Sequence, residues 1–452
     1  MEACKYHIYI CTQEKPPGAP SCAANGAFDL LDKLQKEIVS LGLENEVQVT
    51  PCGSFGLCDR GPNMVIYPDG IWYSKLTPGD IPEIVEEHLK NGKIVERLAN
   101  LDESDLRSTM EANKRKKMAA MKARDEAGVL PDDFMQNLRG FMESRILLTS
   151  LELDIHTHIN KGATAPELAG KIGTDPRATD ALLNALVAIG TLIKDGEIFE
   201  NSPMAERFLS RDADDSARDA LMHIANLWSR WDRLTDCVRE GTSVTYRDMN
   251  ERGDEWTNSF IALMHRNARL RAPIVVKAVG AEGIRKMLDI GGGSGAYSLA
   301  FAKANDNLEA DVFDLPAVIP LAEKYINEGS LSHRVKTIPG DFRDDDFGSG
   351  YDLVFLSAIC HMNGPEENVE LFNKSLNALE PGGKIVMQDF ILNSDRTSPK
   401  QAALFAINML VGTRKGGSYT EEEYREWMIK AGFKEIKHID LPGPTGLITG
   451  IK

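Results

Sequence analysis

The stretch Leu288-Asp-Ile-Gly-Gly-Gly-Ser-Gly-Ala-Tyr297 determines how the C-terminal part of the chain is expected to fold. A short apolar strand carries an acidic residue near its end, and a glycine-rich turn then opens a helix. Glycine lets the backbone approach a ligand closely and present N–H donors to it. Gly291, Gly293 and Gly295 follow a G-x-G-x-G spacing instead of the dinucleotide pattern G-x-G-x-x-G. We therefore expect a ligand with a compact polar head at this turn.

Strands and helices alternate along the chain from Lys286 onward. Strands are expected at residues 287–290, 310–313, 335–338, 353–356 and 384–387. Such alternation predicts a Rossmann-like, doubly wound parallel sheet, which we assign to residues 281–452 of an α/β multi-domain chain.

Acidic and aromatic residues follow the next two of these strands. Asp314 stands where an acid suits the two hydroxyl donors of a ribose. Asp341 and Phe342 combine an acid for an amino group with a ring for stacking. Ribose, amine and flat ring together describe an adenosyl group.

The C-terminal motifs also resemble a known family. GGGSGAYS, FDLPAVIPLA, GDF, LSAICH, LEPGGKIVMQDF and NMLVGT are similar to S-adenosylmethionine (SAM)-dependent O-methyltransferases of the caffeate and hydroxyindole type, over about residues 141–452. The resemblance implies SAM as cofactor, a small-molecule acceptor and a homodimer. The implied cofactor-binding residues are Asp289, Gly291, Gly293, Asp314, Asp341, Phe342 and Ser357.

His361 matches the family's general base. A hydroxyl that attacks the sulfonium methyl must lose its proton, and histidine titrates near neutral pH. Taken alone, a histidine at a strand end is more often a packing residue. Asp389 matches one of the two acids that flank the base in the family, whereas the second falls at about Ser418, which is not acidic.

Residues 136–280 are almost all helical in pattern. Thr164 opens a capping box, Asp175-Pro176 begins a further helix, and a hairpin turns at Asp195-Gly196. This order predicts a winged helix. The helix from Pro176 carries Arg177 as its single basic residue, so dimerisation is favoured over DNA binding.

The overall charge and hydropathy exclude several classes of protein. The chain has 452 residues, with 52 basic and 68 acidic side chains, giving a net charge of −16. So negative a surface repels phosphate backbones and anionic lipid. A run of about 18 apolar residues, as a membrane span needs, is absent. We expect a cytoplasmic protein that binds neither nucleic acid nor membrane.

The cysteines gather near the N-terminus, since five of the seven lie within the first 58 residues. In a reducing compartment, such clustering indicates a metal or redox site. Residues 1–100 predict a small α+β domain, with strands at 6–10 and 47–50, helices at 28–41 and 81–89, and a hairpin at 64–73. Residues 101–135 are expected to form a charged, partly helical linker.

The KPPGAP loop and the GP…VIYPDG…WY run resemble thioredoxin-like [2Fe-2S] ferredoxins, over about residues 5–98. The resemblance implies a [2Fe-2S] cluster on Cys11, Cys22, Cys52 and Cys58. That family usually ends in C-x3-C, which would place a ligand at Ser54. We favour Cys52 because thiolate is the better iron ligand. Zinc, or a metal-free thioredoxin-like fold, remains the alternative.

Three functions are therefore open. The first is SAM-dependent O-methylation of a small conjugated or aromatic hydroxyl compound. Its ferredoxin domain would sense redox state, dock a redox partner protein, or keep a redox-active acceptor such as a quinone reduced. The second is a redox enzyme on a methyltransferase fold, with SAM as a structural ligand. The third is not an enzyme but an electron-carrying or regulatory module whose winged helix binds DNA, which the acidic charge opposes. The resemblance to O-methyltransferases places the family's acceptor pocket at Trp256, Phe260, Met264, His265, Asn408 and Met409, although an apolar stripe at helical spacing is usually core.

Overall fold

The computed structural model describes residues 4–15 and 19–452. The chain divides into two compact units, with the division between Leu138 and Arg139. Among the described residues, no helix is long and apolar enough to cross a membrane.

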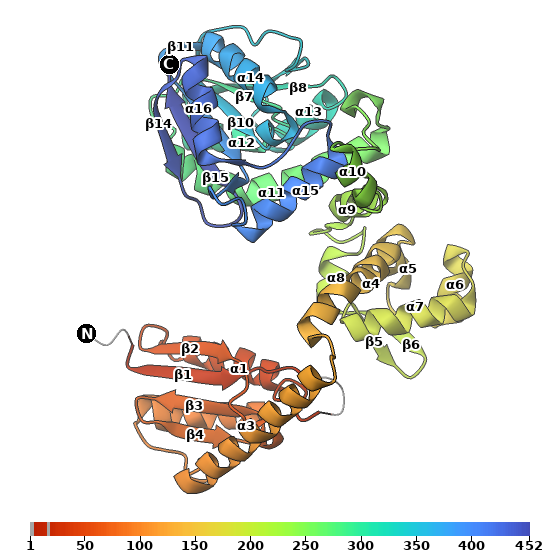
Figure 1. Ribbon diagram of the computed structural model, residues 1–452, viewed down its shortest axis with the longest axis vertical. Coiled ribbons are helices and arrows are strands. Elements are labelled where there is room, and N and C mark those ends of the chain that lie inside the picture. Colours follow the sequence, from red (N-terminus) through yellow and green to blue (C-terminus); the bar gives the residue numbers. More distant parts are fainter. Residues whose placement is uncertain (1–3, 16–18) are drawn as a thin grey trace. The chain divides into compact units, whose positions relative to one another are not determined.

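The N-terminal unit is built on a four-stranded sheet in the order β2-β1-β3-β4, whose strands lie side by side in Figure 1. Strands β1 and β2 are parallel, whereas β3 runs antiparallel to both β1 and β4. Ile8, Leu30, Leu34 and Tyr73 form the centre of its core. The predicted α+β character is confirmed. The elements are β1 (Tyr6–Cys11), α1 (Ala27–Ser40), β2 (Val47–Cys52), β3 (Asn63–Tyr67), β4 (Ile71–Ser74), α2 (Ile81–Glu83) and the π-helical turn η3 (Ile84–Lys90).

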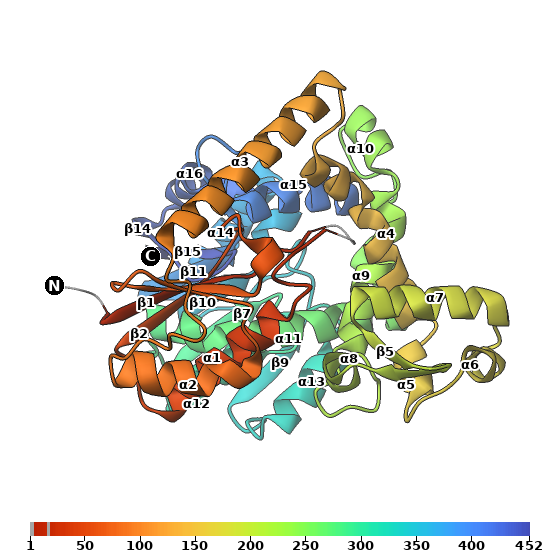
Figure 2. The same cartoon turned by 90° about the horizontal axis from the view of Figure 1, so that it is seen from below.

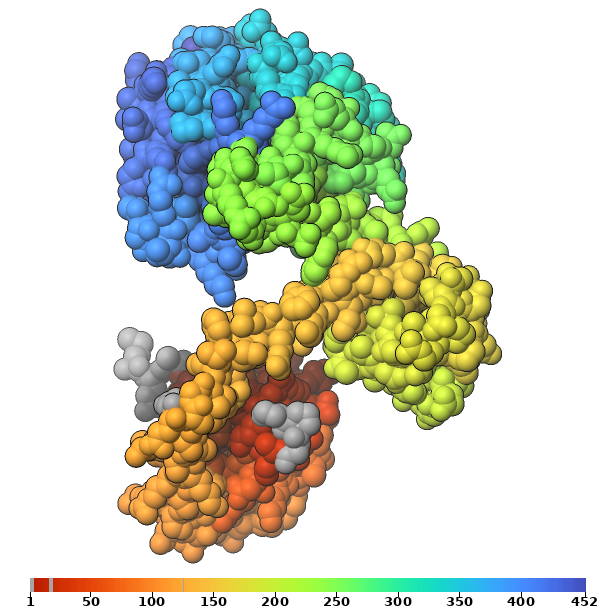
Figure 3. Space-filling model, turned by 45° about the vertical axis from the view of Figure 1, so that its right-hand side comes forward, coloured from red at the N-terminus to blue at the C-terminus, as the bar shows by residue number. Residues whose placement is uncertain are grey.

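Helix α3 (Glu103–Glu126) occupies most of the segment expected to be a linker. Its first half packs on the loop between β2 and β3, and the helix runs across the N-terminal unit as the orange ridge of Figure 3. The Arg60 Nη1 lies 2.5 Å from the Asp105 Oδ2, and the Asn113 Nδ2 donates to the Gly56 carbonyl at 2.7 Å. Leu106 is buried. The linker expectation for residues 101–135 therefore needs correction, because α3 belongs to the N-terminal unit.

Helix α4 (Asp132–Glu152) spans the division between the two units, and the second unit continues with a helical region that contains a β-hairpin. The Thr164 capping box and the Asp175 N-cap form as predicted. The hairpin lies beside α7 (Figure 2), so the expected helix-turn-helix and hairpin order is present. The elements are α4 (Asp132–Glu152), α5 (Ile155–Ile159), α6 (Ala165–Ile172), α7 (Pro176–Ile189), β5 (Leu192–Asp195), β6 (Ile198–Asn201) and α8 (Pro203–Phe208).

Three long helices then pack against one another and against the sheet region. Helix α9 (Arg218–Trp231) lies along α11 (Asp254–Val279), and α15 (Lys400–Gly412) contacts both α9 and the short α10 (Leu234–Glu240). Helix α11 also packs on α12 (Ala296–Ala304), so residues expected in the helical domain up to 280 are continuous with the sheet domain.

The sheet of this unit has seven strands in the order β14-β15-β11-β10-β7-β8-β9. Strands β7 to β11 are parallel and β15 is antiparallel, which confirms the doubly wound prediction and adds two C-terminal strands that it lacked. Met287 and Leu288 pack into separate apolar clusters, as the two faces of a sheet require. The elements are β7 (Lys286–Ile290), α12 (Ala296–Ala304), β8 (Glu309–Asp314), α13 (Ile319–Glu328), β9 (Val335–Pro339), β10 (Tyr351–Ser357), α14 (Pro365–Ala378), β11 (Leu379–Asp389), β12 (Ile391–Leu392), β13 (Tyr419–Thr420), α16 (Glu421–Ala431), β14 (Lys434–Ile439) and β15 (Gly446–Ile451).

Candidate active site and cysteine site

The glycine turn connects the end of β7 to the start of α12. Gly291 and Gly293 have φ values of +64° and +56°, which side-chain-bearing residues rarely adopt. A Cβ atom on Gly291 would lie 2.2 Å from the Ile359 Cδ1. Gly295 caps α12, so the backbone N–H groups of the first turn of the helix are at this end of the sheet.

Asp314 ends β8 and lies against the glycine turn. Its Oδ2 accepts a hydrogen bond from the Gly293 N–H at 2.7 Å, and its Oδ1 accepts one from the Leu315 N–H at 2.7 Å. Burial raises the pKa of Asp314 to about 6. The carboxylate is thus held beside the turn and keeps lone pairs for the two hydroxyls of a ribose.

Asp289 lies fully buried beneath the same turn. The Ser298 hydroxyl donates to its Oδ2 at 2.7 Å, whereas its buried Oδ1 has no partner in the part of the chain that the structure describes. Burial raises the pKa of Asp289 to about 7. A buried carboxylate oxygen without a donor suits a ligand that carries an ammonium group.

The acidic residue after β9, Asp341, already has a basic partner within the protein. Asp341 forms an ion pair with Arg343, at 2.6 Å between the Nη2 and Oδ2 atoms, and Arg343 also reaches Asp248 at 2.6 Å. The Arg343 guanidinium holds the pKa of Asp341 below its usual range. Phe342 packs against the large apolar cluster of the sheet domain. Asp341 is therefore already paired, and an adenine amino group would share it with Arg343.

His361 and Asp389 meet at the ends of neighbouring strands. The His361 Nδ1 lies 2.6 Å from the Asp389 Oδ1, and the His361 backbone N–H donates to the Oδ2 at 3.1 Å. Phe405 packs edge-on against the imidazole, with ring centroids 4.8 Å apart. Among the described residues the Nε2 has no hydrogen-bond partner. A histidine held in this way by a carboxylate has one nitrogen available to take up a proton.

At the position of the family's second acid, this chain has Ser418, whose side chain is a hydroxyl. Ser418 is buried, and its Oγ has no hydrogen-bond partner within the described ranges. The neighbouring Gly417 N–H donates to the His361 carbonyl at 2.9 Å, so this segment contacts the histidine through its backbone. Ser357 lies at the end of β10 and donates to the Gln388 Oε1 at 3.3 Å.

An aromatic and basic cluster lies on α9 and α11. Trp256 and Phe260 stack with centroids 5.1 Å apart, and the His223 ring lies 5.3 Å from that of Trp256. The His223 Nδ1 and the Trp256 Nε1 are buried and have no partner in the described structure. The guanidinium carbon of Arg230 lies 5.5 Å from the Trp256 ring centroid, and burial lowers the pKa of Arg230.

Sequence reasoning proposed Trp256 and Phe260 as acceptor contacts but missed His223 and Arg230. His223 and Arg230 are seven residues apart, which places both on one face of α9. This spacing can be read from the sequence and could have pointed to them. Of the other candidates, Asn408 accepts a hydrogen bond from the Trp231 Nε1 at 3.1 Å, which ties α15 to α9. The His265 Nδ1 lies 2.9 Å from the Ser294 Oγ, so His265 supports the glycine turn.

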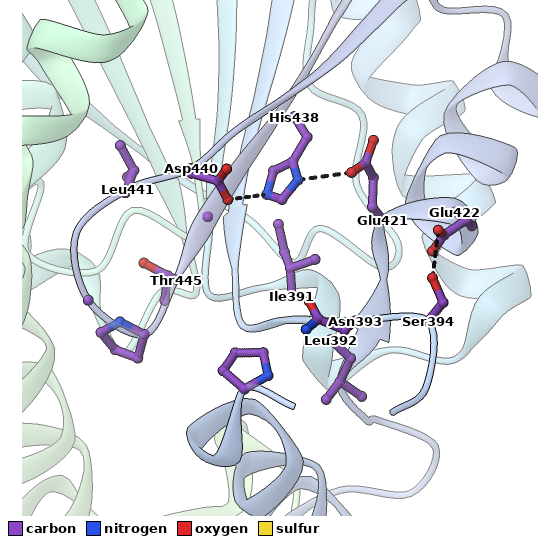
Figure 4. Close-up of a pocket in the computed structure, with 14 residues that line it drawn as sticks. Ile391, Leu392, Asn393, Ser394, Glu421, Glu422, His438, Asp440, Leu441 and Thr445 are labelled. Atoms are coloured by element: carbon purple, nitrogen blue, oxygen red, sulfur yellow. Dashed lines mark hydrogen bonds and ion pairs between the residues drawn. The ribbon is translucent and has the colours of Figure 1, made fainter. Parts of the chain in front are cut away.

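A shallow pocket between β12, β14 and the loop before β15 is shown in Figure 4. His438 lies in it between Glu421, at 2.9 Å, and Asp440, at 3.7 Å. Ser394 donates to Glu422 at 2.8 Å. These polar groups are already paired with one another, so the pocket offers little for a further ligand.

In the N-terminal unit the structure brings three of the predicted cysteine ligands together. The Sγ atoms of Cys11, Cys22 and Cys58 all lie within 4.8 Å of one another, and all three residues are buried. The Cys22 thiol lowers the pKa of Cys11 to about 6 by hydrogen bonding to it. Cys52 lies outside this group, and its Sγ donates to the Ile10 carbonyl at 3.4 Å. Burial raises the pKa of Cys52 to about 11.

The glycine turn, Asp314 and the His361–Asp389 pair all fall within segments that match known proteins. The model of an O-methyltransferase domain matches residues 231–434, and that of an O-methyltransferase dimerisation domain matches residues 135–211. The 3-hydroxy-5-methyl-1-naphthoate 3-O-methyltransferase of Streptomyces sahachiroi is 30% identical over 322 residues, which are 69% of this chain and 93% of that protein. The chain belongs to the O-methyltransferase family.

Further relatives agree with this O-methyltransferase assignment. The acetylserotonin O-methyltransferase of Gallus gallus is 26% identical over 68% of this chain and 93% of its own length. A solved structure of PigF with SAH has 25% identity and a TM-score of 0.66, covering 72% of this chain and 100% of that one. The protein is a SAM-dependent O-methyltransferase, and its dimerisation domain supports a homodimer. Neither family model covers residues 1–134, which include Cys11, Cys22 and Cys58.

Proposed function

We propose that this O-methyltransferase methylates the hydroxyl of a small aromatic acceptor, with His361 as general base and Asp389 as the residue that positions it. The observation that carries the proposal is the 2.6 Å contact between the His361 Nδ1 and the Asp389 Oδ1. Because the Nδ1–H donates to a buried carboxylate, the Nε2 is the nitrogen that accepts the hydroxyl proton. Bound SAM supplies the electrophilic methyl group.

The glycine turn and its acids are proposed to hold SAM. Gly291 and Gly293 approach the methionine part, and Asp314 accepts from the ribose hydroxyls. The unpartnered Oδ1 of Asp289 takes up an ammonium donor. Asp341, Phe342 and Ser357 complete the adenosyl side, with Asp341 remaining paired to Arg343. Alignment of the hydroxyl with the methyl group then provides most of the acceleration.

A direct test separates binding from chemistry. We expect His361→Ala to lower kcat for a phenolic acceptor by about 10²- to 10³-fold, the usual contribution of a general base. SAM affinity, measured by calorimetry, stays within about twofold of the wild type because the described contacts of His361 are with Asp389, Phe405 and Gly417 and not with the glycine turn. Unchanged turnover in the variant would remove His361 from the mechanism.

The acceptor is proposed to be an aromatic hydroxyl compound that also carries an acidic group. Arg230 is partly buried beside Trp256 and makes no ion pair with any described carboxylate, although the chain has 68 acidic residues. The Streptomyces sahachiroi relative is named for a naphthoate acceptor, which contains a carboxylate. We expect Arg230→Met to raise KM for a hydroxynaphthoate at least tenfold but to change KM for the matching naphthol by less than threefold. An equal change in KM for both acceptors would show that Arg230 does not pair with the acceptor's carboxylate.

The N-terminal unit is proposed to be a thioredoxin-like ferredoxin domain that holds a [2Fe-2S] cluster. Its strand–helix–strand unit followed by an antiparallel hairpin supports that fold. The three neighbouring thiols fit an iron–sulfur group, since they are buried and carry hydrogen-bond donors such as the Asn63 Nδ2, 3.5 Å from the Cys22 Sγ. When bound, the cluster would store one electron and exchange it with a redox partner protein.

The cluster proposal has a spectroscopic test. We expect anaerobically purified protein to contain iron and acid-labile sulfide in equal amounts and to give an EPR signal on one-electron reduction. Zinc without sulfide would instead indicate a structural metal site. Substrate conversion that needs electrons and forms no S-adenosylhomocysteine would favour the alternative of a redox enzyme on this fold.

A further inference from the structure

The three-thiol group of Cys11, Cys22 and Cys58 lacks a fourth ligand. Iron in a [2Fe-2S] cluster is held by four protein ligands, two for each metal ion. Two residues could supply the fourth: Cys52, at the end of β2, and Ser54, in the loop that follows. The placement of their side chains distinguishes them.

Cys52 is the last residue of β2 and pairs with Cys11 in the parallel register. Its thiol donates to the Ile10 carbonyl at 3.4 Å, and it is not among the sulfur atoms within 4.8 Å of one another. To reach the group, the side chain would have to leave that carbonyl, and the end of a paired strand would have to shift.

Ser54 lies two residues further along and is next to the group already. Its Oγ is 3.1 Å from the Cys58 Sγ and accepts a hydrogen bond from the Gly56 N–H at 3.0 Å. The loop is held from outside by α3, through the bond from the Asn113 Nδ2 to the Gly56 carbonyl. Ser54 would thus bind without rearrangement of the strand.

We propose that Ser54, and not Cys52, completes the cluster site, giving three thiolates and one serine oxygen. This inference depends on the proposed cluster function. As a ligand, the Ser54 hydroxyl would give up its proton to solvent and hold iron through its oxygen, with no change of oxidation state. An alkoxide is a harder donor than a thiolate and favours the oxidised metal. The reduction potential is therefore lower than with four thiolates.

The experiment compares four full-length proteins reconstituted anaerobically with iron and sulfide: wild type, Cys52→Ala, Ser54→Ala and Ser54→Cys. We expect Cys52→Ala to match the wild type in iron content, visible spectrum and EPR signal. Ser54→Ala loses most of its iron. Ser54→Cys keeps the cluster, with absorption bands shifted to longer wavelength and a higher reduction potential.

The opposite pattern would overturn the inference while leaving the cluster in place. Loss of iron from Cys52→Ala, together with an unaltered Ser54→Ala spectrum, would assign the fourth ligand to Cys52. A wild-type protein that takes up no iron and sulfide would overturn the cluster function itself, and this inference with it. Ser54→Cys guards against misfolding as the explanation of a loss in Ser54→Ala, because it retains a ligand at the same position.

Discussion

The His361 Nδ1 and the Asp389 Oδ1 lie 2.6 Å apart, although 28 residues separate them in the chain. The same carboxylate also accepts the backbone N–H of His361 at 3.1 Å. A single buried acid therefore fixes both the ring and the main chain of the proposed base. Within the described structure its Nε2 is the ring nitrogen left without a partner.

Asp389→Asn tests this positioning role. The neutral amide no longer offers two carboxylate oxygens to the His361 ring and backbone N–H groups, so the histidine loses its preferred tautomer. We expect kcat to fall by about 10²- to 10³-fold, no more than in His361→Ala. SAM affinity should remain within about twofold. The variant Glu421→Gln is the matched control, because it alters another histidine–carboxylate contact, to His438 at 2.9 Å, outside the proposed site. Equal losses in the two variants would point to general destabilisation.

SAM binding should depend on pH through Asp314. Its pKa of about 6 in the free protein lies above the ordinary range of aspartic acid, and in the proposed SAM site it is the ionised form that would accept the ribose hydroxyls. Below pH 6 the proton must be displaced on binding, so the dissociation constant should rise by up to about tenfold per pH unit. Above pH 7.5 it should be constant. Calorimetric titration across pH 5–8 measures this.

The Asp314→Asn variant provides the control for that pH dependence. We expect weaker SAM binding at pH 8 and a shallower slope below pH 6, with the remaining slope due to Asp289, whose pKa is about 7. The same slope in the variant and the wild type would assign the titration to another group.

Gly291→Ala tests the close approach of the glycine turn. A φ of +64° costs an alanine about 1–2 kcal/mol, and its Cβ would meet the Ile359 Cδ1 at 2.2 Å. We expect a loss of SAM affinity of at least tenfold and a lower melting temperature. Gly348→Ala has a similar φ of +71° but no atom within 4 Å of its Cβ. It should lose stability through backbone strain alone and bind SAM normally.

Asn113→Leu tests whether α3 supports the cysteine loop. Removal of the hydrogen bond to the Gly56 carbonyl costs about 1 kcal/mol, which is about fivefold in local opening. We expect faster hydrogen exchange in residues 54–60 and faster loss of iron to a chelator. Lys117→Ala, on the exposed end of the same helix, should change neither rate. Identical rates in all three proteins would show that α3 does not stabilise the loop.

The sequence predicted those parts of the molecule whose causes are local. The glycine turn, the capped helices after Thr164 and Asp175, and five parallel strands follow from short-range pattern. Strands β14 and β15 were missed because an edge pair late in the chain carries no repeating signal of its own. The pairing of His361 with Asp389 came from a family resemblance, since spacing alone does not bring two strand ends together.

Contacts between residues far apart in the chain could not be predicted from the sequence. Arg60 and Asp105 are 45 residues apart, and their ion pair made part of an expected linker into a component of the N-terminal unit. We preferred Cys52 to Ser54 as the fourth ligand because thiolate binds iron better than a hydroxyl does. That argument takes no account of where each side chain lies. The strand register and the hydrogen bond from Cys52 to Ile10 determine that placement, and neither can be read from residue types.

The most direct test of the central claim measures kcat/KM for wild type and His361→Ala with a series of phenols whose hydroxyl pKa ranges from about 10 down to about 6. A general base matters only while the acceptor must still lose its proton. At pH 8 we expect the variant to lose about 10²- to 10³-fold with the least acidic phenol and less than about threefold with the most acidic one. A constant loss across the series, or no loss with the least acidic phenol, would contradict the assignment of His361 as the base.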